Sequence, residues 1–249
     1  MNPIELMNLD LNKDLLSIIE NKRVALVGPS PHLIDTNSGS LIDNYDVVVR
    51  MNDIVPIERL RKDYGSRTDI MFHNLGTPWM PGLKRKIDLF PEQFDNLKMI
   101  VCTSLKADHY HHDWTLANSA GHQRLINNFN SINRNNIPFH WIGHKNYMKL
   151  YGYYNCELYT GTATVSLLSA YPIKELYITG MTFHLIGDTH EEMYCEGHWD
   201  EKDLQGKPKT GWNGGFHSGG SRMQSNLLKQ VIKKSDKICV DSKLREILS

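Results

Sequence analysis

Two short segments of the sequence combine residue types that bind phosphates and nucleosides. The first reads Val-Gly-Pro-Ser-Pro at residues 27–31, directly after an apolar run. Gly28 permits a tight turn, and the Ser30 hydroxyl can hold a phosphate or a base together with the N–H groups of the turn. The segment is neither a Walker sequence nor Gly-x-Gly-x-x-Gly, so it does not favour a dinucleotide site. An ordinary strand-to-helix turn fits it equally well.

The second segment ends an apolar run with Arg50 and Asn52. The amide of Asn52 offers both a donor and an acceptor, which suits a pyrimidine or a ribose. Arg50 fits either a ligand contact or a structural clamp on Asp43 or Asp46. Asn74 follows the next apolar run in the same way, and we include it among the candidate nucleotide-binding residues.

Histidines and carboxylates crowd in two stretches, residues 108–113 and 188–198, that could bind a metal. Their histidines are His109, His111, His112, His190 and His198. A zinc-dependent hydrolase built on the His109/His111/His112 or the His190/His198 cluster is therefore one alternative function. Neither stretch has the helical or hairpin spacing of a metal motif, and the chain has no Asp-x-Asp pair. We expect no metal.

Seven apolar, β-branched runs have the length of strands. They cover residues 23–27, 46–50, 69–73, 99–104, 139–142, 175–179 and 237–240. Helix-compatible segments lie between several of them, at residues 123–133, 162–170 and 221–234. This alternation predicts an α/β fold with a mainly parallel sheet flanked by helices, whose ligands bind beyond the carboxyl ends of the strands. Residues 187–220, rich in Gly, His and Asp, are long enough to form a lid over such a site.

The bulk composition narrows the function classes. A chain of 249 residues can bury one core, so we expect a single domain over residues 1–249. Its 28 basic and 28 acidic residues form no long run of one sign, which argues against nucleic acid as a partner. No apolar stretch can span a bilayer, although peripheral association with a membrane stays open. The four cysteines have no Cys-x-x-Cys spacing, and we expect a cytoplasmic protein with free thiols.

Residues 23–68 resemble the long sialylmotif of the sialyltransferases, glycosyltransferase family 29. The similar residues are Val-Ala-Leu-Val-Gly at 24–28 with Ser30, the run from Ile42 to Asn52, and Gly-Ser-Arg-Thr at 65–68. Their length and order make the resemblance specific.

The short sialylmotif of the same family is similar to residues 159–163. There Thr160, Gly161 and Thr162 begin an apolar helical segment, and the strand-like run at 175–180 then ends in glycine. Two motifs in the right order extend the resemblance over much of the chain.

A third family motif, a histidine before a C-terminal amphipathic helix, is matched by His217. Upstream, residues 197–201 are similar to a segment that faces the nucleotide phosphate in some members, through His198. The sequence also departs from the family. Pro29 replaces an asparagine that contacts the nucleotide, the acid expected after His217 is missing from residues 218–224, and the two cysteines that join the motifs have no counterparts.

The resemblance implies a single Rossmann-like domain, a GT-A-like variant. It implies a transferase that moves an acidic keto-sugar, sialic acid or a Kdo-like sugar, from a CMP-sugar to a glycan acceptor. The reaction would be inverting and metal-independent with no cofactor beyond the donor, with His217 as general base and His198 at the phosphate. The implied nucleotide contacts are Gly28, Ser30, Asn52, Asn74, Thr160, Gly161 and Thr162. A non-catalytic nucleotide-binding module is the other alternative, because the acid after His217 is missing.

Overall fold

The computed structural model describes residues 3–52, 57–75, 80–103, 119–134, 136–183, 195 and 220–249. Its strands are β1 (Arg23–Val27), β2 (Val47–Met51), β3 (Ile70–His73), β4 (Met99–Cys102), β5 (Phe139–Trp141), β6 (Glu175–Thr179) and β7 (Ile238–Val240). They form one seven-stranded sheet in the order β5-β4-β3-β2-β1-β6-β7. Every pairing between them is parallel. The α/β fold with a parallel sheet is therefore confirmed, and each predicted run overlaps a strand.

The chain fills the sheet outward from β1 to β5 and then returns to the other side of β1 with β6 and β7. This reversal creates a topological switch point between β1 and β6, where ligands of such sheets usually bind. The helices are α1 (Pro3–Met7), α2 (Lys13–Ile19), α3 (Gly39–Asp43), α4 (Arg61–Tyr64), α5 (Met80–Leu89), α6 (Pro91–Asp95), α7 (Ser119–Asn130), α8 (Gly143–Tyr154), α9 (Thr160–Ala170), α12 (Gly220–Lys233) and α13 (Ser242–Leu248). Two short 3-10 turns, η1 (Pro31–Leu33) and η2 (Glu58–Leu60), precede α3 and α4.

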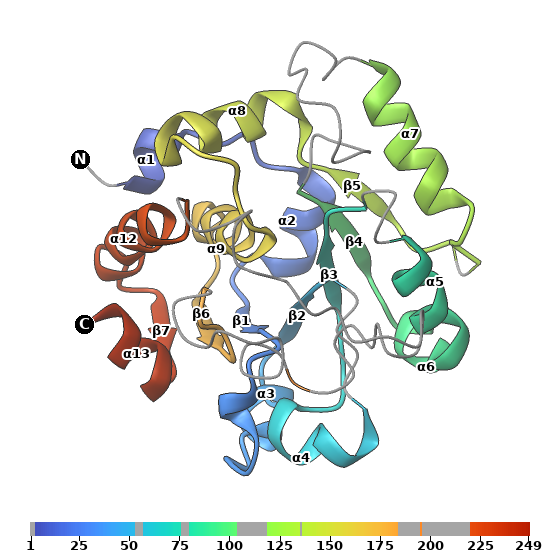
Figure 1. Cartoon of the computed structure of the whole chain (residues 1–249), viewed down its shortest axis with the longest axis horizontal. Coiled ribbons are helices and arrows are strands. Elements are labelled where there is room, and N and C mark those ends of the chain that lie inside the picture. The colour runs from blue at the N-terminus through green and yellow to red at the C-terminus, as the bar shows by residue number, and fades with distance from the viewer. Residues whose placement is uncertain are drawn as a thin grey trace, which may run out of the picture.

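Helices cover both faces of the sheet (Figure 1). One face packs against α1, α2, α8, α9, α12 and α13 in the largest apolar cluster. The other packs against α3 and α4 beside β1 and β2, and against α5, α6 and α7 beside β3 and β4. Because both faces are covered, all five residues of β2 are buried. This explains why the central strands read as continuous apolar runs rather than as alternating patterns.

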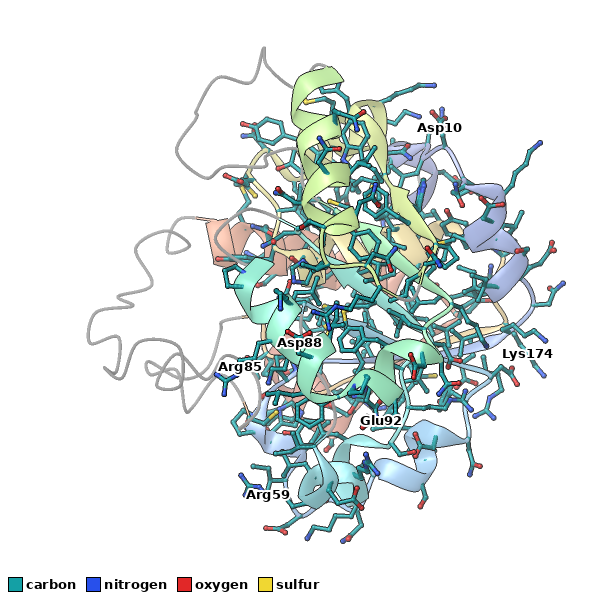
Figure 2. The ribbon with its side chains drawn as sticks, turned by 90° about the vertical axis from the view of Figure 1, so that its right-hand side faces the viewer. Asp10, Arg59, Arg85, Asp88, Glu92 and Lys174 are labelled. Atoms are coloured by element: carbon teal, nitrogen blue, oxygen red, sulfur yellow. The ribbon has the colours of Figure 1, made fainter. Side chains whose placement is uncertain are left out.

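Several charged side chains lie at the periphery of the molecule. Figure 2 shows Asp10, Arg59, Glu92 and Lys174 at the outside of the ribbon. Asp88 on α5 pairs with Lys84 and Arg134 there, at 2.5 and 2.9 Å. In the part of the chain that the structure describes, no helix is both long and apolar enough to cross a membrane. The four cysteines are free, and Cys102 and Cys195 are buried.

Candidate active site

The carboxyl ends of β3, β2, β1 and β6 lie next to one another, because these strands are parallel neighbours in the sheet. Gly28 follows β1, Asn52 follows β2, Asn74 follows β3 and Gly180 follows β6. Three predicted nucleotide contacts, far apart in the sequence, therefore reach one edge of the sheet beside the switch point. We take this edge as the candidate active site.

The turn at Gly28 and the N-terminus of α9 meet at one side chain, that of Met181. An ideal Cβ on Gly28 would lie 2.4 Å from Cγ of Met181, and one on Gly161 would lie 2.7 Å from its Cε. The Cβ position of Gly161 also lies 3.4 Å from Sδ of Met51, at the end of β2. The two predicted phosphate-binding turns are separated by more than half of the chain in sequence. In the structure they contact the same methionine side chain.

Two polar atoms of the predicted contacts are buried and have no hydrogen-bond partner within the described part of the chain. They are Oδ1 of Asn52 and Oγ1 of Thr162. Leaving such an atom unpaired costs about 1–3 kcal/mol, so a ligand group is a natural partner. The backbone of Asn52 is left-handed, with φ of 54°, and its N–H donates to the carbonyl of Phe72 at 2.6 Å. The turn therefore fixes the backbone position from which the side chain of Asn52 extends.

The orphaned hydroxyl of Thr162 contrasts with the other hydroxyls of α9. Thr164, Ser166 and Ser169 each donate to the carbonyl four residues back, at 2.6–2.9 Å. Thr162 is completely buried but lies in the first turn, where the carbonyl four residues back belongs to Leu158, outside the helix. The first turn of a helix also leaves backbone N–H groups for a ligand. The N-terminus of α9 thus combines the N–H groups of a first helical turn with a buried hydroxyl that has no partner among the described residues.

The segment before α9 is fixed by Gln224, a buried residue of α12. Its Oε1 accepts from the backbone N–H of Tyr159 at 3.1 Å, and its Nε2 donates to the carbonyl of Glu157 at 2.8 Å. A helix near the C-terminus therefore sets the position of the second predicted turn.

Ser30 is 2% exposed, and its polar groups are engaged within the protein. Its N–H donates to the carbonyl of Gly180 at 2.8 Å, and its Oγ lies 2.9 Å from Nδ1 of His32. Its carbonyl accepts from the hydroxyl of Tyr64 at 2.6 Å. In this structure, Ser30 fixes the first turn, and its hydroxyl is turned toward His32.

Arg50 is a structural residue. It is completely buried, and it donates to the carbonyl of Tyr64 at 2.7 Å, to the carbonyl of Arg67 at 3.2 Å and to Oγ1 of Thr68 at 3.1 Å. Burial lowers the pKa of Arg50 to about 10, so the guanidinium stays charged at neutral pH. The carboxylate of Asp43 accepts from the N–H and hydroxyl of Ser66, and that of Asp46 accepts from the N–H of Arg23. A direct clamp of Arg50 on either carboxylate, one of the two interpretations of the sequence, is therefore absent among these described residues. Arg50 instead ties β2 to the segment before β3.

His73 ends β3 directly before Asn74 and is 1% exposed. Its Nδ1 accepts from the N–H of Leu75 at 2.8 Å. Burial lowers the pKa of His73 to about 3, because a charged imidazole would be desolvated there. The side chain is therefore neutral at physiological pH.

The pKa of His73 predicts a loss of stability in mild acid. Below about pH 6.5 the unfolded chain binds a proton at this position that the folded chain does not bind. Above that pH, His73 does not lower the free energy of unfolding. Below it, the free energy of unfolding falls by ~1.4 kcal/mol per pH unit as the pH drops toward 3. His73→Asn should flatten this slope, because its amide oxygen can accept from Leu75 without titrating. Urea unfolding of both proteins between pH 5 and 8 measures the difference, and equal slopes would contradict the assignment.

Several predicted residues lie outside the described part of the chain. They are His109, His111, His112, His190, His198 and His217. Among the residues that are described, no three His, Cys, Asp or Glu side chains form a group that could hold a metal ion. From the candidate lid at 187–220, Cys195 is described, and its N–H donates to the carbonyl of Pro29 at 2.6 Å. One residue of that segment therefore lies against the first turn.

Sequence reasoning did not identify His32, Asp241 or Gln224. Two signals were available: His32 lies two positions after a candidate ligand, and Asp241 directly follows the last strand. A glutamine on the buried face of an amphipathic helix is a weaker signal.

Similarity to known proteins indicates which protein family this chain resembles. The family model described as "Glycosyltransferase family 29 (sialyltransferase)" matches residues 7–114. A beta-1,6-galactosyltransferase of Arabidopsis thaliana is 35% identical over 68 residues, which are 26% of this chain and 17% of that protein. The match thus spans far less than two thirds of that relative.

Two crystal structures of a mammalian sialyltransferase are also similar to this chain. One, in complex with Gal-beta-1-3GalNAc-ortho-nitrophenol, aligns with 96% of this chain and 76% of its own, at 16% identity and a TM-score of 0.49. The other aligns with 96% and 77%, at 19% identity and a TM-score of 0.47. The sequence match over residues 7–114 contains the whole of the long motif at 23–68, so this part of the chain is similar to glycosyltransferase family 29, the sialyltransferase family.

Proposed function

We propose that this chain is a glycosyltransferase that moves an acidic keto-sugar, sialic acid or a Kdo-like sugar, from a CMP-sugar donor to a glycan acceptor. The similarity of residues 7–114 to the family model supports the reaction class. The observation that carries the proposal is the convergence of the turn at Gly28 and the N-terminus of α9 on Met181, with the unpaired atoms of Asn52 and Thr162 at the same edge. This arrangement suits one nucleoside monophosphate whose phosphate lies at the N-terminus of α9, with the turn at Gly28 beside it.

In the proposed reaction, the acceptor hydroxyl displaces CMP with inversion at the anomeric carbon. The transition state resembles an oxocarbenium ion, the leaving phosphate gains negative charge, and the acceptor oxygen loses a proton. The N–H groups at the start of α9 face the phosphate, aided by His198, and His217 takes the proton. A monophosphate leaving group needs less neutralisation than a diphosphate. The lack of an Asp-x-Asp pair in the chain is in line with a reaction that needs no metal.

A nucleotide screen tests the donor class. Thermal unfolding with CMP, CDP, UDP, ADP and NAD should show stabilisation by the cytidine nucleotides alone, since a ligand at 100 times its Kd stabilises the folded state by ~2.7 kcal/mol. Stabilisation by UDP or NAD instead would reject the proposal. Retention of CMP release from CMP-sialic acid in the presence of a chelator separates this function from a zinc-dependent hydrolase. Cytidine binding without that release would point to the non-catalytic module.

Asn52→Gly should separate ligand binding from stability. Glycine adopts the left-handed backbone of residue 52 without the strain that Asn52→Ala would add, so this change removes only the side chain. We expect CMP to bind about tenfold more weakly, as after loss of one hydrogen bond to a ligand. The unliganded protein should be equally or more stable, because a buried unpaired oxygen is removed. Calorimetric titration and urea unfolding measure the two effects. Unchanged CMP affinity would remove Asn52 from the site.

A further inference from the structure

A chain of hydrogen bonds runs from the first turn of the site to the far edge of the sheet through His32. Its Nδ1 lies 2.9 Å from Oγ of Ser30, and its Nε2 lies 3.0 Å from Oδ2 of Asp241. Ser30 and His32 follow β1, whereas Asp241 follows β7, 209 residues after His32. Since β6 lies between β1 and β7, the three side chains connect elements that are not neighbours in the sheet.

Asp241 gathers more donors than a helix cap requires. Its Oδ1 accepts from the N–H of Leu244 at 2.7 Å, which caps α13. Its Oδ2 accepts from Oγ1 of Thr179 at 2.8 Å and from the N–H of Gly180 at 2.9 Å, in addition to His32. Burial raises the pKa of Asp241, but hydrogen bonds from His32, Leu244 and Gly180 outweigh burial, so the pKa falls below its usual 3.8. The carboxylate is therefore ionised at neutral pH.

The ionised carboxylate can only accept a hydrogen bond, so Nε2 of His32 carries the hydrogen that it donates to Asp241. In the tautomer whose single ring hydrogen is on Nε2, Nδ1 accepts from the hydroxyl of Ser30. This order of groups resembles a Ser-His-Asp triad. However, Ser30 is only 2% exposed and is closed to a substrate carbon. The hydrogen-bonded side chains of Ser30, His32 and Asp241, here called the relay, therefore hold Ser30 in place and do not activate it as a nucleophile.

The part that the relay holds is the first turn of the candidate site. The N–H of Gly28 donates to the carbonyl of Thr179 and the N–H of Ser30 donates to the carbonyl of Gly180, both at 2.8 Å. The turn after β1 is thus joined to the turn after β6 by two backbone hydrogen bonds. Asp241 binds the β6 side of this pair directly and the β1 side through His32, so one carboxylate fixes both turns.

We propose that His32 and Asp241 are positioning residues, which hold the turn at 28–30 against the end of β6 and so set the shape of the sheet edge at which the donor binds. The inference rests on the proposed function. Neither side chain touches the donor in this arrangement. Their contribution passes through Ser30 and Gly180, and it should appear as nucleotide affinity and donor KM rather than as acceptor KM.

A double-mutant cycle tests this role. His32→Gln retains a polar side chain but lacks a nitrogen at the place of Nδ1, and Asp241→Asn keeps one oxygen for the cap of α13. We expect each change to weaken CMP binding about fivefold to tenfold, as after loss of one hydrogen bond. The double variant should bind about as weakly as Asp241→Asn alone, because that change already removes the contact through which His32 acts. Titration calorimetry with CMP gives the affinities.

Asn12→Ala is the matched control for a loss of stability. Asn12 caps α2 by accepting from the N–H of Leu15 at 2.8 Å, as Asp241 caps α13, but its own N–H donates to the hydroxyl of Tyr171, at the opposite end of α9 from Thr162. The control should unfold more easily and bind CMP as the wild type does. CMP binding that His32→Gln leaves intact, or effects that multiply in the double variant, would overturn the inference alone. Failure of the wild type to bind CMP would remove the proposed function and this inference together.

Discussion

Gly28→Ala should lower the free energy of unfolding by about 3 kcal/mol, at the upper end of the range for overpacked positions. An ideal Cβ at this position would lie 2.3 Å from the carbonyl oxygen of Gly180 and 2.4 Å from Cγ of Met181. The methionine can move, but the carbonyl cannot, because Gly180 is itself bonded to Ser30 and Asp241. The methyl group must therefore push β1 and β6 apart at the switch point.

Gly152→Ala provides the matched control, because an ideal Cβ on this residue of α8 meets nothing within 4 Å. Alanine in a helix interior should stabilise the protein by ~0.5–1 kcal/mol relative to glycine. Urea unfolding at neutral pH compares the two variants with the wild type. If Gly28→Ala unfolds as the wild type does, the two turns are not packed as described.

The strands were the most predictable part of the fold. The bounds of β1 and β6 agree with the predicted runs at both ends, and β2 is shifted by one residue. This success has a physical cause, because strands buried on both faces of a parallel sheet must be apolar at nearly every position. The order of the strands in the sheet could not be predicted in the same way, because an apolar run does not indicate which other strands pair with it.

Helices were less predictable. The sequence indicated α7, α9 and α12 but not α8, whose twelve residues include four tyrosines. Tyrosine favours strands in general, and here Tyr147 and Tyr154 are buried against the sheet through tertiary packing. Packing therefore decided a helix that local preference did not favour.

The candidate site likewise contains residues that could be identified from the sequence and residues that could not. Gly28, Asn52 and the residues that begin α9 could be identified because they directly follow or begin recognisable elements, and the sheet brings such positions together. The link between His32 and Asp241 could not be identified, because it joins residues 209 positions apart and no periodicity records such a pair. Motifs thus indicate which turns meet, whereas the structure is needed to show what holds them.

His217→Ala should reduce the rate of CMP release from CMP-sialic acid by about 10²–10⁴-fold, the usual contribution of a general base. The attacking oxygen, from water or from an acceptor glycan, must lose its proton as the new bond forms, and a neutral imidazole can take it. Nucleotide affinity should change little, because a general base acts on the proton of the acceptor and not on CMP. The loss should therefore appear in kcat, with the Kd for CMP nearly as in the wild type.

Two comparisons make this test specific to the base. His144→Ala removes an exposed histidine at the start of α8 and should leave kcat unchanged. Added imidazole should restore part of the rate in His217→Ala, because a free base can enter the space left by the side chain, and it should not accelerate the wild type. A His217→Ala variant with wild-type kcat would remove this residue from the base role. A variant that loses CMP affinity and rate equally would instead make His217 a donor-binding residue, because a base acts on the acceptor proton only after the nucleotide is bound.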